Sequence, residues 1–261
     1  MNTRYLVAAL AIALATPALA QKQLLWGDTH LHTTYSSDAF ANNNLRADPE
    51  SAFRYASGLP TVHPYHQARV PIETPLDFLV VSDHAEFLGV IRNTYFEGVD
   101  KTDVGFIDGI KGDIAAWILQ RAVDKGEGRS LFVDVLPVAE DPLAAAQQIL
   151  DEGVPVGWLP PQPQVEIDTW NTITGFADKY NKPGEFTALI GWEWSSIPGG
   201  ANLHRVVVTS ADAATAQQFQ PFGLDDSPFP VDLWAWLETT SNDTGADFIA
   251  IPHNSIISKG Y

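Results

Sequence analysis

Residues 76–84 read LDFLVVSDH, an apolar run that ends in a charged pair. The run predicts a buried strand over Leu76–Ser82. Asp83 and His84 follow directly, and charges at the end of so apolar a strand must be solvated, paired or bound to a metal. The alternative is an N-capping aspartate beside a loop histidine. The stretch therefore predicts a central strand with polar chemistry at its carboxyl end.

Further β-rich runs alternate with helical patterns along the chain. The runs are Leu24–Leu31, Phe186–Trp194, Leu203–Thr209 and Asp247–Ile251. The helical patterns are Glu50–Ser57, Ile110–Val123, Pro142–Asp151, Val165–Tyr180 and Val231–Thr239. Strands separated by helices predict an α/β fold whose parallel sheet is open or closed into a barrel. Residues 90–164 lack this rhythm and are expected to form an inserted helical and loop subdomain.

Most of the seven histidines fall at the predicted strands. The five in question are His30, His32, His84, His204 and His253. Because the carboxyl ends of parallel strands form one working face, we expect these imidazoles to meet. His63 and His66 lie in a proline-containing segment outside the predicted strands and are not expected to take part.

His30 and His32 are two residues apart on a strand, which places both rings on one face. Such a pair can bind one metal ion, and Asp28 and Asp38 add carboxylates for the same site or its surroundings. A His-x-His motif alone is weak, and exposed or core histidines are the alternative.

Glu193 lies in the strand sequence Ile190–Trp194, where alternation places it on the opposite face from Trp192 and Trp194. A carboxylate flanked by two indoles is rarely a simple surface charge, because an unpaired buried carboxylate is costly. Glu193 is therefore predicted to be a bridging metal ligand. Arg205 is a candidate clamp for a substrate oxygen, with a structural surface arginine as the alternative.

The amino-acid composition limits both the binding partners and the metal ligands that are available. The 261 residues include 32 Asp and Glu, only 15 Lys and Arg, and no cysteine. A formal charge of -17 without a basic stripe argues against nucleic-acid binding. Without cysteine, any metal must bind to His, Asp and Glu. These ligands suit Zn, Mn or Fe without choosing among them.

The N-terminal residues 1–20 have the layout of a signal peptide. Arg4 precedes the apolar run Leu6–Leu14, and Ala18-Leu19-Ala20 resembles a cleavage site. We expect export to a periplasm or to the medium after cleavage near Ala20. The alternative to a cleaved signal peptide is an N-terminal membrane anchor, but the apolar run is too short to span a membrane stably.

Two stretches carry a resemblance to a known family. Residues 27–38, GDTHLHTTYSSD, and residues 76–87, LDFLVVSDHAEF, resemble the opening motifs of the PHP superfamily of metal-dependent phosphoesterases. Residues 191–195, 202–205 and 251–254 are similar to later motifs of an exported branch of that superfamily, long labelled a domain of unknown function. The resemblance spans about residues 26–261 and is weak only in the insert.

The resemblance implies one domain over residues 21–261, a distorted (β/α)7 PHP-type barrel holding two or three divalent ions, Mn or Zn with Fe as an alternative. By position, His30 and His32 would bind one ion and Glu193 would bridge to a second, held by His204 and His253. Asp38 and His84 would hold a third or lie beside it. The superfamily closes its site with a later Asp-x-His pair that this sequence lacks, so a fragment with an incomplete barrel is expected.

These residues predict an exported metal-dependent hydrolase of small-molecule phosphoester, phosphonate monoester or sulfate ester bonds. A hydroxide bridging the ions would be the nucleophile, with Glu193, Arg205 and Asp83 as candidate catalytic residues. The expected partner is a small anionic ester. The alternative is a non-catalytic exported protein that binds metal or ligand at an incomplete site.

Overall fold

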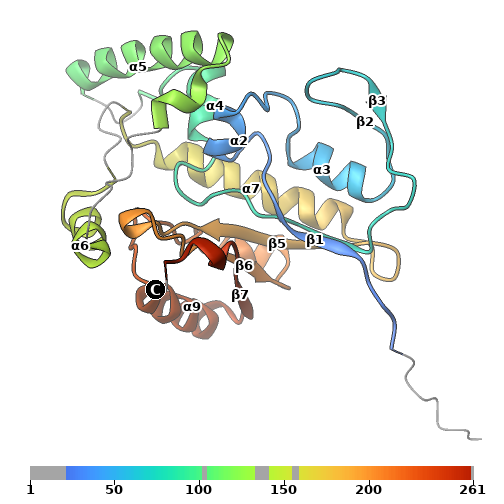
Figure 1. Ribbon diagram of the computed structural model, residues 1–261. Coiled ribbons are helices and arrows are strands. Elements are labelled where there is room, and N and C mark those ends of the chain that lie inside the picture. The colour runs from blue at the N-terminus through green and yellow to red at the C-terminus, as the bar shows by residue number, and fades with distance from the viewer. Residues whose placement is uncertain (1–21, 102–104, 133–140, 155–158, 260–261) are drawn as a thin grey trace, which may run out of the picture.

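The computed structural model describes residues 22–101, 105–132, 141–154 and 159–259. They form a mixed α/β fold around a curled five-stranded sheet (Figure 1). Its strands are β1 (Gly27–Leu31), β4 (Phe78–Val81), β5 (Thr187–Trp194), β6 (Arg205–Thr209) and β7 (Phe248–Pro252). Two short strands, β2 (Thr61–Val62) and β3 (Arg69–Val70), pair in a separate hairpin.

The described residues also form eight α-helices and three 3₁₀ helices. The α-helices are α2 (Ser37–Ala41), α3 (Pro49–Ala56), α4 (Val90–Phe96), α5 (Phe106–Asp124), α6 (Pro142–Glu152), α7 (Pro163–Tyr180), α8 (Ala213–Ala216) and α9 (Pro230–Thr244). The 3₁₀ helices are η1 (Gly128–Phe132), η2 (Pro198–Gly200) and η3 (Ser255–Ile257). All five predicted strands and all five predicted helices are present. The helices α2, α4 and α8 and the hairpin were not predicted, because so few residues carry no periodic pattern.

The sheet order is β1-β4-β5-β6-β7. The pairs β1–β4 and β4–β5 are parallel, whereas β5–β6 and β6–β7 are antiparallel. The prediction of an all-parallel sheet is therefore wrong for β6. Only residues 195–204 connect β5 to β6, and a parallel crossover needs about a dozen residues or more. Because β6 runs backwards, its first residue lies at the same edge as the last residues of the other four strands.

The outer face of the sheet carries the main core, covered by α3, α7 and α9 (Figure 1). Alternate β5 side chains point into it, including the fully buried Trp192 and Trp194. Trp170 of α7 packs edge-on against Trp192, with ring centroids 5.7 Å apart. The indole NH groups of Trp192 and Trp194 donate to the carbonyl oxygens of Phe222 and Ser227. These bonds fix β5 and so fix which side chains face inward.

The inner face of the sheet is thinly covered. Val80, Val206 and Val208 form a small buried cluster there. Gly191 lies beside this cluster. A larger residue would not fit there, because a Cβ atom at this position would lie 2.5 Å from the Val80 side chain. Toward the edge strand β7, Ile249 opposite Val208 stays 66% exposed. The sheet is thus half a barrel, with an inner surface open at β7.

The helices begin where the sequence signals predict. Asp48 caps α3 by accepting the amide of Ser51, and Pro49 follows at the first helical position. Asp141 caps α6 in the same way, with Pro142 next. The predicted insert contains α4, α5, η1 and α6, and Figure 1 shows α5 and α6 lying to one side of the sheet.

Some predictions concern segments outside the described residues. The signal-peptide region, residues 1–20, is among them, as are residues 102–104, 133–140 and 155–158 of the predicted insert. Within the described ranges, no helix has both the length and the apolar character needed to cross a membrane.

Candidate metal centre

A single buried carboxylate, Glu193, lies at the centre of a histidine cluster. It follows Trp192 near the end of β5, on the inner face that strand alternation predicts. Its Oε2 atom lies 2.7 Å from His32 Nε2 and 3.2 Å from His30 Nε2. Its Oε1 atom lies 2.8 Å from His204 Nδ1 and also contacts His253 Nε2. Each carboxylate oxygen therefore faces its own pair of imidazoles at close range, and His84 Nδ1 lies farther from Oε2, at 3.7 Å.

Five strand ends bring these side chains together. His30 lies in β1, and His32 lies one residue beyond it. His84 follows β4, and a backbone β-bridge pairs it with Glu193 of β5. His253 follows β7, and His204 precedes β6, which delivers its ring from the amino end of an antiparallel strand. The expectation that the five histidines meet is confirmed, although the strand direction assumed for His204 is wrong.

A second carboxylate, Asp38, lies beside the cluster on the first turn of α2. Its Oδ1 atom lies 2.9 Å from His32 Nδ1 and accepts the hydroxyl proton of Ser36 at 2.6 Å. Its Oδ2 atom is 4.0 Å from His84 Nε2. Asp28 lies at the other side, where its carboxylate accepts the backbone amide of His30 at 2.8 Å. Asp38 therefore extends the cluster, and Asp28 holds the strand that carries His30.

The cluster perturbs its own protonation. Burial disfavours ionised Glu193, but the surrounding histidines outweigh it and hold the pKa of Glu193 well below its usual range. Burial also lowers the pKa of His32, yet Asp38 and Glu193 reverse this and raise it to about 10. Burial lowers the pKa of His84 to about 4, so that imidazole is neutral at pH 7. Glu193 thus stays charged although it is buried, and a buried charge requires cationic partners.

The donor set fits a divalent metal ion. The Nε2 atoms of His32 and His204 are buried and have no aligned hydrogen-bond partner among the described residues. The residues form three candidate groups, and within each group the donor atoms lie within 4.8 Å of one another. The groups are His30, His32 and Glu193; His32, Asp38 and His84; His84, Glu193 and His204. Neighbouring ligands bound at about 2.1 Å to one ion are separated by roughly 3.0–3.4 Å, and the 3.2 Å between His30 Nε2 and Glu193 Oε2 matches this range. The cluster could therefore hold a metal ion.

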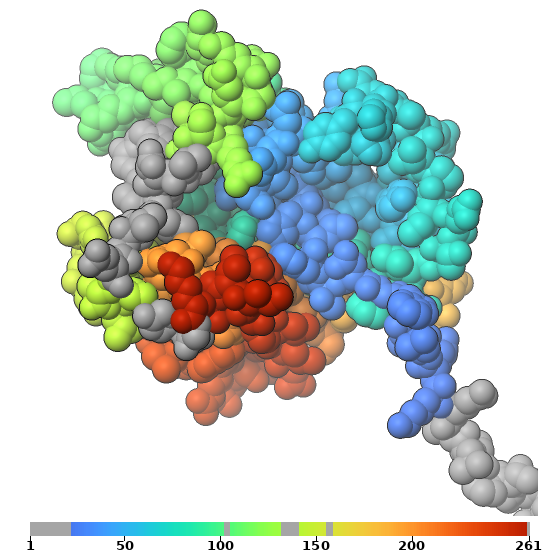
Figure 2. Space-filling view, viewed as in Figure 1, coloured from blue at the N-terminus to red at the C-terminus, as the bar shows by residue number. Residues whose placement is uncertain are grey.

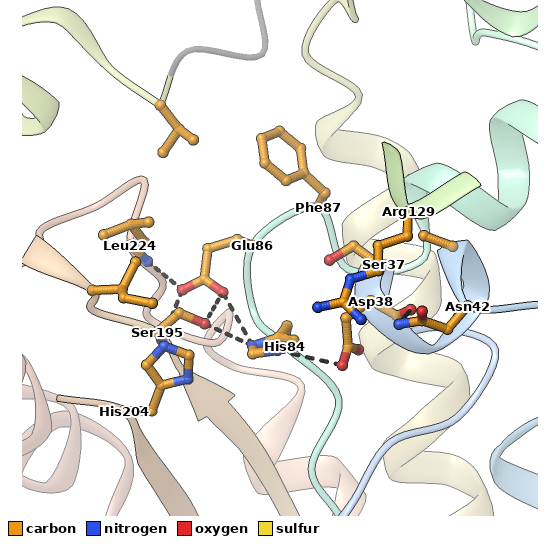
Figure 3. Close-up of a pocket in the computed structure, with 13 residues that line it drawn as sticks. Ser37, Asp38, Asn42, His84, Glu86, Phe87, Arg129, Ser195, His204 and Leu224 are labelled. Carbon is orange, nitrogen blue, oxygen red and sulfur yellow. Dashed lines mark hydrogen bonds and ion pairs between the residues drawn. The ribbon is translucent and has the colours of Figure 1, made fainter. Parts of the chain in front are cut away.

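Two residues that sequence reasoning missed, Ser195 and Glu86, support His84. The Ser195 hydroxyl lies 2.6 Å from His84 Nδ1 and donates to Glu86 Oε2 at 2.7 Å (Figure 3). Glu86 is buried and also accepts the amides of Ser195 and Leu224. Because the Ser195 hydroxyl directs its hydrogen at Glu86, its oxygen accepts from His84 Nδ1, and the Nε2 lone pair of His84 is left free. Spacing was the available signal, since both residues lie two positions after a predicted ligand.

Replacing Ser195 with alanine is expected to lower metal affinity about 10- to 100-fold, the usual effect of losing a partner that orients a metal-bound histidine. Competition with a colour-forming chelator would measure this affinity. Ser196→Ala is the matched control, because the Ser196 hydroxyl donates to the Pro228 carbonyl oxygen rather than to a histidine. Equal affinities in the two variants would contradict the role assigned to Ser195.

Arg205 and Asp83, the other two predicted catalytic residues, bind neighbouring parts of the chain. Arg205 Nη1 donates to the carbonyl oxygens of Leu203 and His204. The Asp83 carboxylate is buried and accepts both the amide and the hydroxyl of Thr33. Arg205 therefore fixes the backbone that carries His204, and Asp83 fixes the turn after β1. Both are positioning residues here.

The remaining histidines lie elsewhere, as expected. His63 and His66 are in the loop between β2 and β3, with ring centroids 4.6 Å apart. They belong to none of the candidate metal-binding groups.

A pocket of about 560 Å³ opens beside the cluster (Figure 3). Asp38, His84 and His204 lie in its wall. The apolar lining comes from Phe87, Val154, Ile197 and Leu224, and a single cation, Arg129, is among the lining residues. A volume in this range accommodates a small molecule.

The comparisons with known proteins assign no activity. No curated protein matches the chain, and no solved structure matches it either. The family described as "Protein of unknown function (DUF3604)" matches residues 19–261. Because this match covers nearly all of the sequence, the chain belongs to the DUF3604 family.

Proposed function

We propose that this protein is an exported metal-dependent hydrolase acting on phosphoester, phosphonate monoester or sulfate ester bonds of small molecules. The observation that supports this proposal most strongly is the position of the Glu193 carboxylate. Its two oxygens each contact a separate pair of histidines. A carboxylate so placed suits a bridge between two divalent ions, Mn or Zn with Fe as an alternative. His30 and His32 would hold one ion, and His204 and His253 the other. Asp38 and His84 would hold a third ion or lie beside the pair.

Such ions, when bound, supply Lewis acidity: they polarise an ester oxygen and lower the pKa of water. The chain supplies the rest. His84 stays neutral through burial and is oriented by Ser195. Phe87 and Leu224 form apolar walls that would exclude water and accept an apolar leaving group. The site thus combines fixed ligands with a pocket of small-molecule size.

The proposed substrate clamp is Arg129 rather than Arg205. Arg129 lies on η1 and points into the pocket toward Asp38 and His84 in Figure 3. Its position is specified by Gly128, since a Cβ atom there would lie 2.7 Å from the Ala41 carbonyl oxygen of α2. Within the described residues, the guanidinium makes no hydrogen bond or ion pair, so it is available for an anionic ester.

Replacing Arg129 with glutamine is expected to lower kcat/KM for an anionic ester by about 10- to 100-fold, the value of one charge-assisted hydrogen bond. Arg129→Lys should retain part of the activity, and metal content should be unchanged in both. Steady-state kinetics with aryl phosphate would measure the effect. Wild-type kcat/KM in Arg129→Gln would remove Arg129 from the substrate site.

We also propose that the half-barrel is part of a PHP-type (β/α)7 barrel, with residues 1–20 as a signal peptide. The curl of the sheet and the gathering of polar side chains at one edge support the barrel. The exposed apolar side chain of Ile249 on the inner face of β7 supports it too, because an edge of this kind is where a barrel wall continues.

The test of the hydrolase is turnover of aryl phosphate, phosphonate and sulfate esters by the metal-loaded chain. Hydrolysis of at least one class, lost after chelation and restored by added metal, is the expected result. Bound metal without turnover of any ester would favour a non-catalytic metal-binding protein instead.

A further inference from the structure

A second pocket, of about 610 Å³, gathers three arginines away from the metal cluster. Arg46 comes from the loop before α3, Arg54 from α3 itself and Arg69 from β3. Figure 2 shows a hollow between the cyan hairpin segment and the blue segment that precedes it. None of the residues lining this pocket lines the one beside the cluster.

The concentration of positive charge is unusual for this chain. The sequence has eight arginines among 15 basic residues, against 32 acidic ones. Three of those eight line this one pocket, and none of its lining residues within the described ranges is acidic. Like charges held together repel one another, so the arrangement is unfavourable without a neutralising anion.

Two carboxylates that neighbour these arginines, in sequence or by charge, are already engaged. Asp48 follows Arg46 closely in sequence, but its side chain caps α3 at the amide of Ser51. Glu50 feels the charge of Arg54, yet its Oε1 atom is bound by Lys179 at 2.5 Å and by the Tyr180 hydroxyl at 2.9 Å. Neither of these two carboxylates therefore pairs with the pocket arginines.

The three arginine side chains also have few hydrogen-bond partners among the described residues. Arg54 Nη2 reaches only the Pro60 carbonyl oxygen, at 3.4 Å. Over the part of the chain that the structure describes, the side chains of Arg46 and Arg69 have no hydrogen bond or ion pair. Arg69 is held in place by its backbone, since the hairpin pairs it with Val62. Among the described residues, these two exposed guanidinium groups are therefore unpaired.

We propose that this pocket binds a phosphate or sulfate group, free or carried as an ester. Three guanidinium forks can surround a tetrahedral dianion, because each offers parallel N–H donors to its oxygens. The Ser51 hydroxyl, which also lines the pocket, adds a neutral donor. The site is separate from the proposed hydrolytic centre and does not depend on it.

The test compares anion binding at constant ionic strength in the metal-loaded wild type and two double variants. R46Q/R69Q removes two charges from the pocket, whereas K125Q/K182Q removes two from exposed lysines elsewhere. Calorimetric titration with inorganic phosphate, inorganic sulfate, glucose 6-phosphate and glucose 6-sulfate measures affinity. Loss of one binding site, or at least about a tenfold loss of affinity, is expected in R46Q/R69Q alone. R46K/R69K should retain part of the affinity.

A thermal melt separates binding from a structural role. In chloride buffer without multivalent anions, R46Q/R69Q should melt no lower than the wild type, because removing like charges relieves repulsion. With phosphate or sulfate, the wild type should gain more in Tm than the variant. Binding of the sugar esters would indicate an ester ligand, and binding of the inorganic ions alone a free anion. Equal anion affinity in the wild type and R46Q/R69Q, or a lower Tm of the variant in both buffers, would overturn the proposal.

Discussion

Replacing Glu193 with alanine is expected to remove at least one metal ion per chain and to lower kcat/KM for ester hydrolysis by at least about 10³-fold. The reason is that both carboxylate oxygens are used, Oε1 toward His204 and His253 and Oε2 toward His30 and His32. Loss of one group that stabilises transition-state charge already costs about 10²- to 10³-fold, and loss of a shared ligand adds misplacement of the ions. Elemental analysis and steady-state kinetics on the same preparations would measure both effects.

The matched control for this variant is Glu166→Gln. Glu166 is a partly buried glutamate outside the cluster, whose pKa is raised to about 7 by burial and by the charges of Asp225 and Asp226. It contacts none of the histidines and should keep wild-type metal content and activity. Glu193→Gln, which preserves the shape of the side chain, should resemble Glu193→Ala in turnover. Unchanged metal content in both Glu193 variants would refute the bridging role.

Removing the metal is expected to destabilise the whole protein. At a free metal concentration about 1,000 times the Kd, binding to the folded state alone contributes about 4 kcal/mol to the free energy of unfolding. For a chain of this size, that corresponds to a fall in Tm of roughly 8–16 °C after chelation. The physical cause is that the carboxylates of Glu193 and Asp38 remain ionised after chelation. Their negative charges are then no longer neutralised by the metal.

Scanning calorimetry with and without chelator would measure this shift. His204→Ala removes one imidazole from the Oε1 side of Glu193 and should shrink the chelator effect. His63→Ala, in the hairpin loop, should show the full wild-type effect. A Tm that does not respond to chelator in the wild type would contradict a stabilising metal.

The sequence predicts the metal-ligand candidates well because strand alternation and strand ends are local properties. An apolar run ending at Asp83-His84, and a glutamate between two tryptophans, each specify a face without knowledge of the rest of the fold. Such patterns locate individual side chains. The meeting of five strand ends then follows from how strands pair in a sheet.

What the sequence does not predict depends on contacts between distant segments. The reversal of β6 is an exception, because the predicted runs that end at Trp194 and begin at Leu203 already leave too few residues for a parallel crossover. Arg205 and Arg129 are both isolated arginines in the sequence. Only the packing of η1 against α2 directs Arg129 into the pocket, whereas Arg205 turns to nearby carbonyl oxygens.

The most direct test of the metal centre is the metal content of the purified chain by elemental mass spectrometry, measured beside Glu193→Ala and Glu166→Gln. The proposed centre predicts two or more divalent ions per chain in the wild type and in Glu166→Gln, and at least one fewer in Glu193→Ala. A wild-type chain that binds no divalent ion after incubation with Mn, Zn or Fe would contradict it.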